Sequence, residues 1–259
     1  MNNYIDDVAK KKESLYRSEF LRYAVRAMYA GMYLTLGSAV AFIAANHFSG
    51  IDPVIGRAIY ALLFPWGLVT IILLNGELAT SNMMFLTNAT YRKSIPARSA
   101  VGILLVCTLF NLLGSMAIAF MLSRTTLFSN LEATHYMYNA IETKLAKPYG
   151  AMFFDGIIAN ILVNIAIIGS VRIKETSAKI LFVVAIIFIF CYFGFEHVIA
   201  NFGGFSLVMF TNPGVIESFT FGNVIMHWLL VFVANYIGGG LVMGLGYAWL
   251  DSTKTNYLD

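Results

Sequence analysis

The chain has 259 residues, of which 59% are hydrophobic and only 12% are charged. Because soluble globular domains carry about 25% charged residues, this composition excludes an ordinary soluble enzyme, a disordered chain and a nucleic-acid-binding protein. The mean hydropathy of +0.73 predicts a polytopic membrane protein. We expect the net charge of +3 to reflect membrane topology rather than a nucleic-acid partner.

Residues 1–26 are polar and of mixed charge, and they lack the apolar region of a cleavable signal peptide. The spacing of Leu15, Phe20, Leu21 and Val25 predicts an amphipathic helix on the cytoplasmic surface of the membrane. We expect this helix to occupy 1–26 and to lead into the first transmembrane segment.

Six apolar segments are long enough to cross a bilayer core of about 30 Å, which needs roughly 20 residues per helix. They span approximately 27–48, 57–90, 99–123, 149–171, 179–210 and 222–250. We therefore expect one six-span domain over 27–250, followed by a tail at 251–259. Thirteen of the 17 lysines and arginines lie in the two tails and in the second and fourth loops. The positive-inside rule then places both termini in the cytoplasm.

The second and fifth segments are too long for one crossing and contain polar residues near their middle. The sequences NGELATSN (75–82) and GFEHVIAN (194–201) both have glutamate third and asparagine eighth. Broken backbone at membrane depth is tolerated only where it is buried in protein or lines an aqueous cavity. We therefore expect a broken helix in each of these two spans.

A single offset of 119 residues is predicted to relate the two halves of the chain; the alternative is chance identity in a membrane sequence of low complexity. The offset joins four pairs of identical residues: Glu77 with Glu196, Asn82 with Asn201, Gly31 with Gly150 and Gly37 with Gly156. The offset maps a first repeat, about 27–123, onto a second, about 149–250. Since each repeat has three spans, the two must have inverted topology, and paired broken helices in such repeats indicate a permeation site.

The two glutamates are expected to brace the interrupted backbone, together with Asn82 and Asn201. The alternative is that a glutamate lies near a helix end and reaches water. We do not expect Glu77 or Glu196 to contact a permeating anion, because a bare carboxylate would repel it.

Three basic side chains are candidates for contact with an anion. His197 follows Glu196 directly, and its imidazole can donate a hydrogen bond or a proton near neutral pH; a polar contact between helices is the alternative. Lys144 and Lys147 precede the fourth span on the face that is poor in basic residues. A lysine there either concentrates anions in a vestibule or only places its ammonium at the membrane interface.

Other chemistry is not indicated by the sequence. The histidines are scattered and no Cys–His spacing is present, so we expect no metal site. No cofactor-binding or catalytic motif occurs either, and we expect neither a cofactor nor enzymatic activity.

Four segments resemble the formate/nitrite transporter family: FPWGL (64–68), NGELATSN (75–82), GIIANILVN (156–164) and GFEHVIAN (194–201). The resemblance covers nearly the whole chain and is greatest to the family's hydrosulfide-channel branch. It implies an all-α membrane protein with an aquaporin-like fold of six transmembrane helices, inverted repeats and two broken helices (spans 2 and 5). It also implies a homopentamer in the bacterial inner (cell) membrane that conducts small monovalent anions through one pore per subunit.

The resemblance also implies roles for individual residues. The pore residues in contact with the anion would be Thr80, Lys144, Asn160 and His197. The hydrophobic constrictions would be Phe64, Leu68, Leu78, Val163 and Phe190, although periodicity alone would make these ordinary core residues.

One position departs from the family pattern. Formate and nitrite members usually have phenylalanine between the leucine and threonine of the first broken span, where this chain has Ala79. We therefore expect a passive hydrosulfide channel. A formate or nitrite channel of the same fold and a pore for neutral solutes are the alternatives.

Overall fold

The computed structural model describes residues 2–253, and the regular structure within that range is helical. The elements are α1 (Asn2–Ser18), α2 (Phe20–Ser49), α3 (Pro53–Leu63), α4 (Trp66–Leu73), α5 (Ala79–Tyr91), α6 (Ala97–Ser123), α7 (Tyr136–Leu145), α8 (Tyr149–Arg172), α9 (Thr176–Tyr192), α10 (Val198–Thr211), η1 (Pro213–Val215), α11 (Phe221–Tyr236), the π-helix η2 (Ile237–Leu245) and α12 (Gly246–Leu250). Within residues 2–253, five helical segments are long and apolar enough to cross a membrane by length and composition: Phe20–Ser49, Pro53–Leu73, Ala97–Ser123, Tyr149–Arg172 and Phe221–Leu250. The shorter apolar helices α9 and α10 make up the remaining predicted span.

Both predicted broken spans are confirmed. In the first, α4 ends at Leu73 and α5 begins at Ala79; in the second, α9 ends at Tyr192 and α10 begins at Val198. Each break contains one residue with positive φ, Asn75 at 53° and Gly194 at 71°. These two residues also lie 119 positions apart. Asparagine and glycine are the residue types that adopt this conformation most readily.

The two breaks also have equivalent backbone hydrogen bonds. The amide of Gly76 donates to the carbonyl of Ile71 at 2.9 Å, and the amide of Phe195 donates to the carbonyl of Phe190 at 3.2 Å. These bonds satisfy carbonyls that the ended helices would otherwise leave free. The inverted repeat thus extends to the backbone conformation at both breaks.

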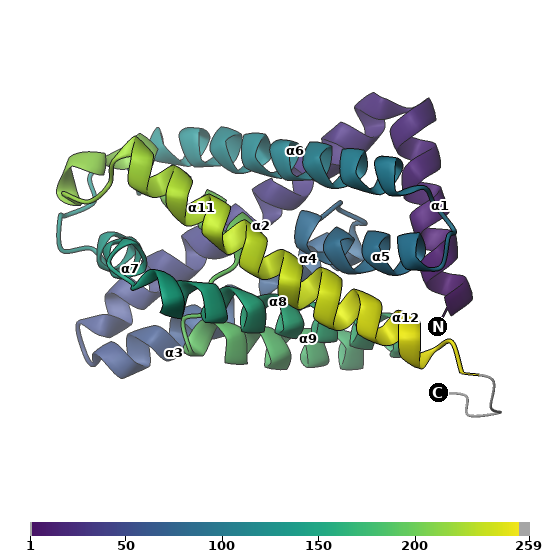
Figure 1. Ribbon diagram of the computed structural model, residues 1–259. Coiled ribbons are helices and arrows are strands. Elements are labelled where there is room, and N and C mark those ends of the chain that lie inside the picture. Colours follow the sequence, from purple (N-terminus) through teal and green to yellow (C-terminus); the bar gives the residue numbers. More distant parts are fainter. Residues whose placement is uncertain (1, 254–259) are drawn as a thin grey trace.

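The long helices run along one bundle, and the broken spans end inside it (Figure 1). Figure 1 shows α1 and α12 at one end of the bundle and α3 and α7 at the other. An even number of crossings explains why the first and last helices share an end.

The N-terminal helix is shorter than expected. It ends at Ser18, and Glu19 has a non-helical backbone before α2 begins at Phe20. Phe20 and Leu21 are 48% and 75% exposed at the start of α2. The boundary expected at residue 26 is therefore wrong, because Phe20 and Leu21 lie on the first long apolar helix instead of on the surface helix.

The glycine pairs at the 119-residue offset are not structurally equivalent. A Cβ at Gly31 would lie 2.0 Å from the carbonyl oxygen of Asn111, whereas Gly150 has no atom within 4 Å. Gly37 packs against the second span of the first repeat, whereas Gly156 packs against the third span of its own, second repeat. Only the glutamate and asparagine pairs reflect the repeat.

Polar contacts fasten α1 to the bundle. Asp6 accepts hydrogen bonds from Arg92 Nη2 at 3.0 Å and from Ser94 Oγ at 2.6 Å. Burial raises the pKa of the Asp6 carboxyl, but the hydrogen bonds from Arg92 and Ser94 outweigh burial and hold the pKa below its ordinary value. The contact therefore stabilises the docked helix above the ordinary carboxyl pKa of about 3.9.

We expect α1 to stay docked between about pH 5 and pH 8 and to loosen only below about pH 4, where Asp6 becomes protonated. Electron paramagnetic resonance distances between spin labels at positions 10 and 93 measure this docking. The Arg92→Gln variant should show the longer distance already at pH 7. An identical distance distribution for this variant and the parent protein at pH 7 would show that the Asp6 contact does not hold the helix.

Candidate functional site

Two neighbouring cavities lie along the second broken span, where α9 and the loop before α10 line both of them. The larger, here called the vestibule, has a volume of about 390 Å³ and is bordered by α3, α7 and the loop before α10. The smaller, here called the inner cavity, has a volume of about 10 Å³, which is room for about one water molecule. Phe64 and Phe190 line both cavities, with their ring centroids 5.9 Å apart. These two rings therefore separate the vestibule from the inner cavity.

The inner cavity is apolar except for one side chain. Its lining consists of Leu34, Phe64, Leu68, Leu78, Val163, Ile187, Phe190 and His197. The structure thus brings the five residues expected to form constrictions around one cavity, with the predicted histidine among them. Any ion at this point loses most of its water and meets one polar group.

The protonation of His197 follows from its hydrogen bonds. Its Nδ1 accepts from the backbone amide of Ala200 at 3.1 Å, as the N-cap of α10. A neutral imidazole with an accepting Nδ1 carries its proton on Nε2. Nε2 lies 2.8 Å from Thr80 Oγ1, so we assign the hydroxyl of Thr80 as the acceptor. Thr80 is fully buried and contributes through this bond, and it does not line either cavity.

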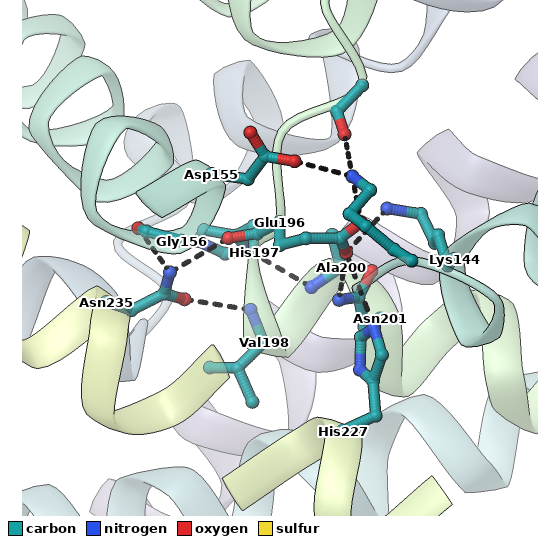
Figure 2. Close-up of polar contacts among 12 residues, drawn as sticks. Lys144, Asp155, Gly156, Glu196, His197, Val198, Ala200, Asn201, His227 and Asn235 are labelled. Atoms are coloured by element: carbon teal, nitrogen blue, oxygen red, sulfur yellow. Dashed lines mark hydrogen bonds and ion pairs between the residues drawn. The ribbon is translucent and has the colours of Figure 1, made fainter. Parts of the chain in front are cut away.

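A buried charge cluster adjoins the vestibule at the break of the second span, and Figure 2 shows its polar contacts. Glu196 is fully buried and accepts hydrogen bonds from Lys144 Nζ, Lys147 Nζ and Asn201 Nδ2, each at 2.8 Å. A buried carboxylate requires such partners. All three partners are side chains, and one of them, Lys147, also donates to a backbone carbonyl of the break, that of Gly194.

The two lysines of this cluster differ in how many of their three N–H donors are used. Lys147 Nζ donates to Glu196, to Asp155 at 2.7 Å and to the carbonyl of Gly194 at 2.9 Å. Burial lowers the pKa of Lys147, but the charges of Glu196 and Asp155 raise it further, and the pKa lies above its ordinary value. Within residues 2–253, Lys144 Nζ donates one hydrogen bond, to Glu196, and Lys144 also lines the vestibule. Lys144 therefore has donors left for a ligand, whereas Lys147 has none.

The first broken span contains the equivalent arrangement. Glu77 accepts a hydrogen bond from Asn82 Nδ2 at 3.1 Å and pairs with Lys12 Nζ of α1 at 2.5 Å. In both repeats the glutamate is thus bound by the asparagine five residues later and by a lysine from outside the repeat's broken span. The sequence did not identify Lys12, because no pattern relates a residue of the N-terminal tail to a break 65 residues later.

Sequence reasoning missed Asn111 and Asn235, which hold the two breaks from α6 and α11. Asn235 Nδ2 donates to the carbonyls of Glu196 (2.9 Å) and Gly156 (2.7 Å), and its Oδ1 accepts from the amide of Val198 (2.9 Å). Asn111 makes the same three bonds to the carbonyls of Glu77 and Ala27 and to the amide of Ala79. An amide side chain within the apolar part of the third span of each repeat was the available signal.

We expect Asn235→Ala to lower the free energy of unfolding by about 2–3 kcal/mol, because it leaves buried polar groups of the second break without partners. The drop in the melting temperature of the detergent-solubilised protein measures this. Asn223→Ala is the matched control on the same helix, since Asn223 is exposed and its side chain binds only Ser218. Equal melting temperatures for the two variants would contradict a structural role of Asn235.

Asn160 does not occupy the place expected for it. It is fully buried and lines neither of the two cavities. Its Nδ2 donates to the carbonyls of Thr80 (3.2 Å) and Asn235 (2.8 Å). A Cβ at Gly239 would lie 2.1 Å from this nitrogen, so the glycine of the π-helix allows the close approach. The amide thus fixes the carbonyl of a predicted pore residue and is not itself exposed to the cavity.

His227 of α11 is a further residue that the sequence did not connect to the site. It is 1% exposed, and its Nε2 lies 3.6 Å from Glu196 Oε2. Its ring packs on Phe205, with centroids 4.8 Å apart. His227 therefore belongs to the surroundings of Glu196.

The comparisons with known proteins agree with this geometry. Residues 2–249 match the model of the formate/nitrite transporter family. The chain belongs to the formate/nitrite transporter family. Members of this family and fold are transporters and channels rather than enzymes, and the chain is an integral membrane protein.

Individual relatives in this family are moderately similar to the chain. The nitrite transporter NirC of Escherichia coli (strain K12) is 30% identical over 236 residues, covering 91% of this chain and 85% of NirC. The formate channel BtFdhC of Bacillus thuringiensis is 29% identical over 188 residues, covering 71% of this chain and 70% of BtFdhC.

Solved structures confirm the aquaporin-like fold expected for this family. A channel of the formate/nitrite transporter family superposes with a TM-score of 0.91 at 28% identity, covering 97% of this chain and 98% of the other. A pentameric formate channel superposes with a TM-score of 0.78 at 23% identity, covering 89% and 96% of the two chains, and shares the fold.

Proposed function

We propose that this member of the formate/nitrite transporter family is a passive channel for hydrosulfide and other small monovalent anions. The observation that carries the proposal is the imidazole of His197, the one polar group in an apolar cavity that Phe64 and Phe190 close toward the vestibule. The distribution of basic residues supports a cytoplasmic location of both termini. The pentameric formate channel with the same fold supports a homopentamer with one pore per subunit.

The path of the anion begins in the vestibule. Lys144 has ammonium donors that Glu196 does not use, so it receives the anion at the inner end of this cavity. Glu196 holds Lys144 in place through Oε2, which also accepts from Asn201, while Lys147 donates to Oε1. The anion thus meets a positioned cation before it reaches the two phenylalanine rings.

The inner cavity then removes the remaining water from the anion. A bare anion in an apolar cavity carries a large desolvation cost unless it is hydrogen-bonded. The Nε2–H of His197 supplies that bond when the imidazole turns from Thr80 to the anion. After the anion has passed, Nε2–H again donates its hydrogen bond to the Thr80 hydroxyl. Because Ala200 keeps Nδ1 as an acceptor, donation of a hydrogen bond fits this site better than a charged imidazolium.

The braces keep this geometry in place. Glu77, Asn82 and Asn201, with Glu196, hold the two breaks so that Leu78 and His197 meet at the inner cavity from opposite repeats. Asn160 keeps the carbonyl of Thr80 turned away from the cavity. These residues would position the path without contacting the anion.

The preference for hydrosulfide rests on size and on position 79. The inner cavity has room for about one water molecule, so hydrosulfide, with one heavy atom, needs less widening there than formate or nitrite, which have three. Ala79 is fully buried beside Thr80, and the phenylalanine usual in formate and nitrite members would need different packing there.

Two alternatives remain open to experiment. The named nitrite transporter and formate channel among the relatives favour a formate or nitrite channel of the same fold. The apolar lining of the inner cavity favours a pore for neutral solutes such as hydrogen sulfide.

Flux into proteoliposomes tests the substrate directly. With hydrosulfide, formate, nitrite and chloride compared at one pH, one concentration and one membrane potential, we expect hydrosulfide to be fastest. Liposomes without protein are the control for leakage of the neutral acid. A higher rate for formate or nitrite would replace hydrosulfide as the substrate, and no flux above the control for any anion would reject the channel.

Lys144→Gln should raise the half-saturating anion concentration about 5-fold, because the inner end of the vestibule loses a cation while Lys147 keeps Glu196 paired. The maximal flux should change less. Lys174→Gln, at an exposed lysine of the loop between α8 and α9, is the control. If the half-saturating anion concentration of Lys144→Gln equals that of the parent protein, Lys144 does not contact the permeating anion.

A further inference from the structure

The charges deep in the vestibule cancel one another. Lys144 and Lys147 carry two positive charges, and Glu196 and Asp155 carry two negative charges, all within 2.8 Å of an opposite partner. A neutral cluster of this kind has little field at a distance, because the fields of close opposite charges largely cancel. It holds an anion that has arrived but attracts few anions from solution.

One cation of the vestibule lacks such a partner. Arg57 of α3 is exposed and lines the cavity, and its guanidinium forms no ion pair within the part of the chain that the structure describes. The net positive charge of the vestibule therefore resides on Arg57.

Tyr136 of α7 lines the same vestibule as Arg57, and its ring centroid lies 6.0 Å from that of Tyr60, one helical turn after Arg57 on α3. Burial raises the pKa of the Tyr136 hydroxyl, and the charge of Arg57 opposes that rise. Both side chains line the vestibule, where they offer a guanidinium and a phenolic O–H to the same space.

Aromatic rings connect this position to the inner cavity. Arg57, Tyr60 and Phe64 follow the i, i+3, i+7 spacing of one helix face. Ring centroids are 5.8 Å apart from Tyr60 to Phe64, 5.9 Å from Phe64 to Phe190 and 6.0 Å from Phe190 to His197. A row of rings thus links the helix face of Arg57 to the two phenylalanines that separate the vestibule from the inner cavity.

We propose that Arg57 and Tyr136 form an anion-collecting site at the mouth of the vestibule, where small monovalent anions bind before they pass to Lys144. This site rests on the proposed channel function and deepens it. Arg57 supplies the attraction from solution, and Lys144 supplies the contact at the inner end. The guanidinium stays charged at all physiological pH values, so the collecting step does not depend on external pH.

The test compares Arg57→Gln with the parent protein in proteoliposomes, using hydrosulfide, formate and nitrite as probes at several ionic strengths. At low ionic strength we expect the half-saturating concentration to rise about 3- to 10-fold, with little change in maximal flux. In about 0.5 M impermeant salt the difference should shrink below about 2-fold, because salt screens the attraction. Arg57→Lys should retain most of the parent affinity.

The matched control is Arg124→Gln, since Arg124 is exposed at the far end of α6, over the ring of Phe120 and outside the vestibule. Half-saturation of Arg57→Gln equal to the parent protein at low ionic strength would overturn the collecting site, and so would an equal effect of Arg124→Gln. In both cases the parent protein still conducts the probe. Failure of the channel function itself would show differently, as absence of flux through the parent protein.

Discussion

The Glu196→Leu variant is expected to lose about 3–5 kcal/mol of stability and nearly all anion flux. Leucine removes the carboxylate that Lys144, Lys147 and Asn201 share, and Lys147 alone keeps another acidic partner in Asp155. Breaking a buried ion pair by removing one partner leaves the other charge without compensation. Yield after solubilisation and the melting temperature of the purified protein measure the loss.

A second variant of Glu196 separates the effect of charge from that of shape, and a variant of an exposed glutamate is the control. Glu196→Gln keeps the shape and one acceptor oxygen, and it should lose less stability than the leucine variant. Glu217→Gln, at an exposed glutamate of the loop before α11, should behave as the parent protein. A leucine variant that melts at the parent temperature would contradict the central place of Glu196 in the charge cluster.

Replacement of His197 by asparagine should reduce anion flux about 10- to 100-fold while the protein stays folded. A hydrogen bond to a charged group contributes about 1.5–3 kcal/mol, and the inner cavity has no other polar side chain to replace it. Asparagine is a good N-cap, so it can still accept from the amide of Ala200, but its shorter side chain cannot reach Thr80. Initial flux rates at matched protein content measure the effect.

Thr80→Val is the companion to this variant. Valine keeps the shape of threonine and removes the hydroxyl that binds Nε2, so we expect a smaller loss of flux than in His197→Asn. If His197→Asn has both the flux and the melting temperature of the parent protein, the anion passes without the imidazole.

The sequence was sufficient to locate the two breaks and to relate them. A glutamate and an asparagine at the same place in two apolar spans are rare at membrane depth, and Glu77 and Glu196 do lie at equivalent points of the fold. Local composition carries this information, because each break contains its own polar residues. The same reasoning placed His197 beside the second break.

Partners from distant helices were beyond the sequence. Asn111 and Asn235 lie 124 residues apart, and the offset of 119 that joins the glutamates does not join them. The pairing of Lys12 with Glu77 depends on how α1 docks, and the burial of Asn160 depends on Gly239 of the π-helix. Such contacts follow from tertiary packing, which no local pattern encodes.

The single measurement that tests the account most directly is hydrosulfide flux into proteoliposomes at imposed potassium diffusion potentials, with the parent protein and His197→Asn side by side. If the anion crosses by way of the imidazole, flux through the parent protein follows the potential, and the variant loses about 10- to 100-fold of it. Flux that is independent of the potential and equal in both proteins would contradict an anion channel through this cavity and would indicate a pore for the neutral acid.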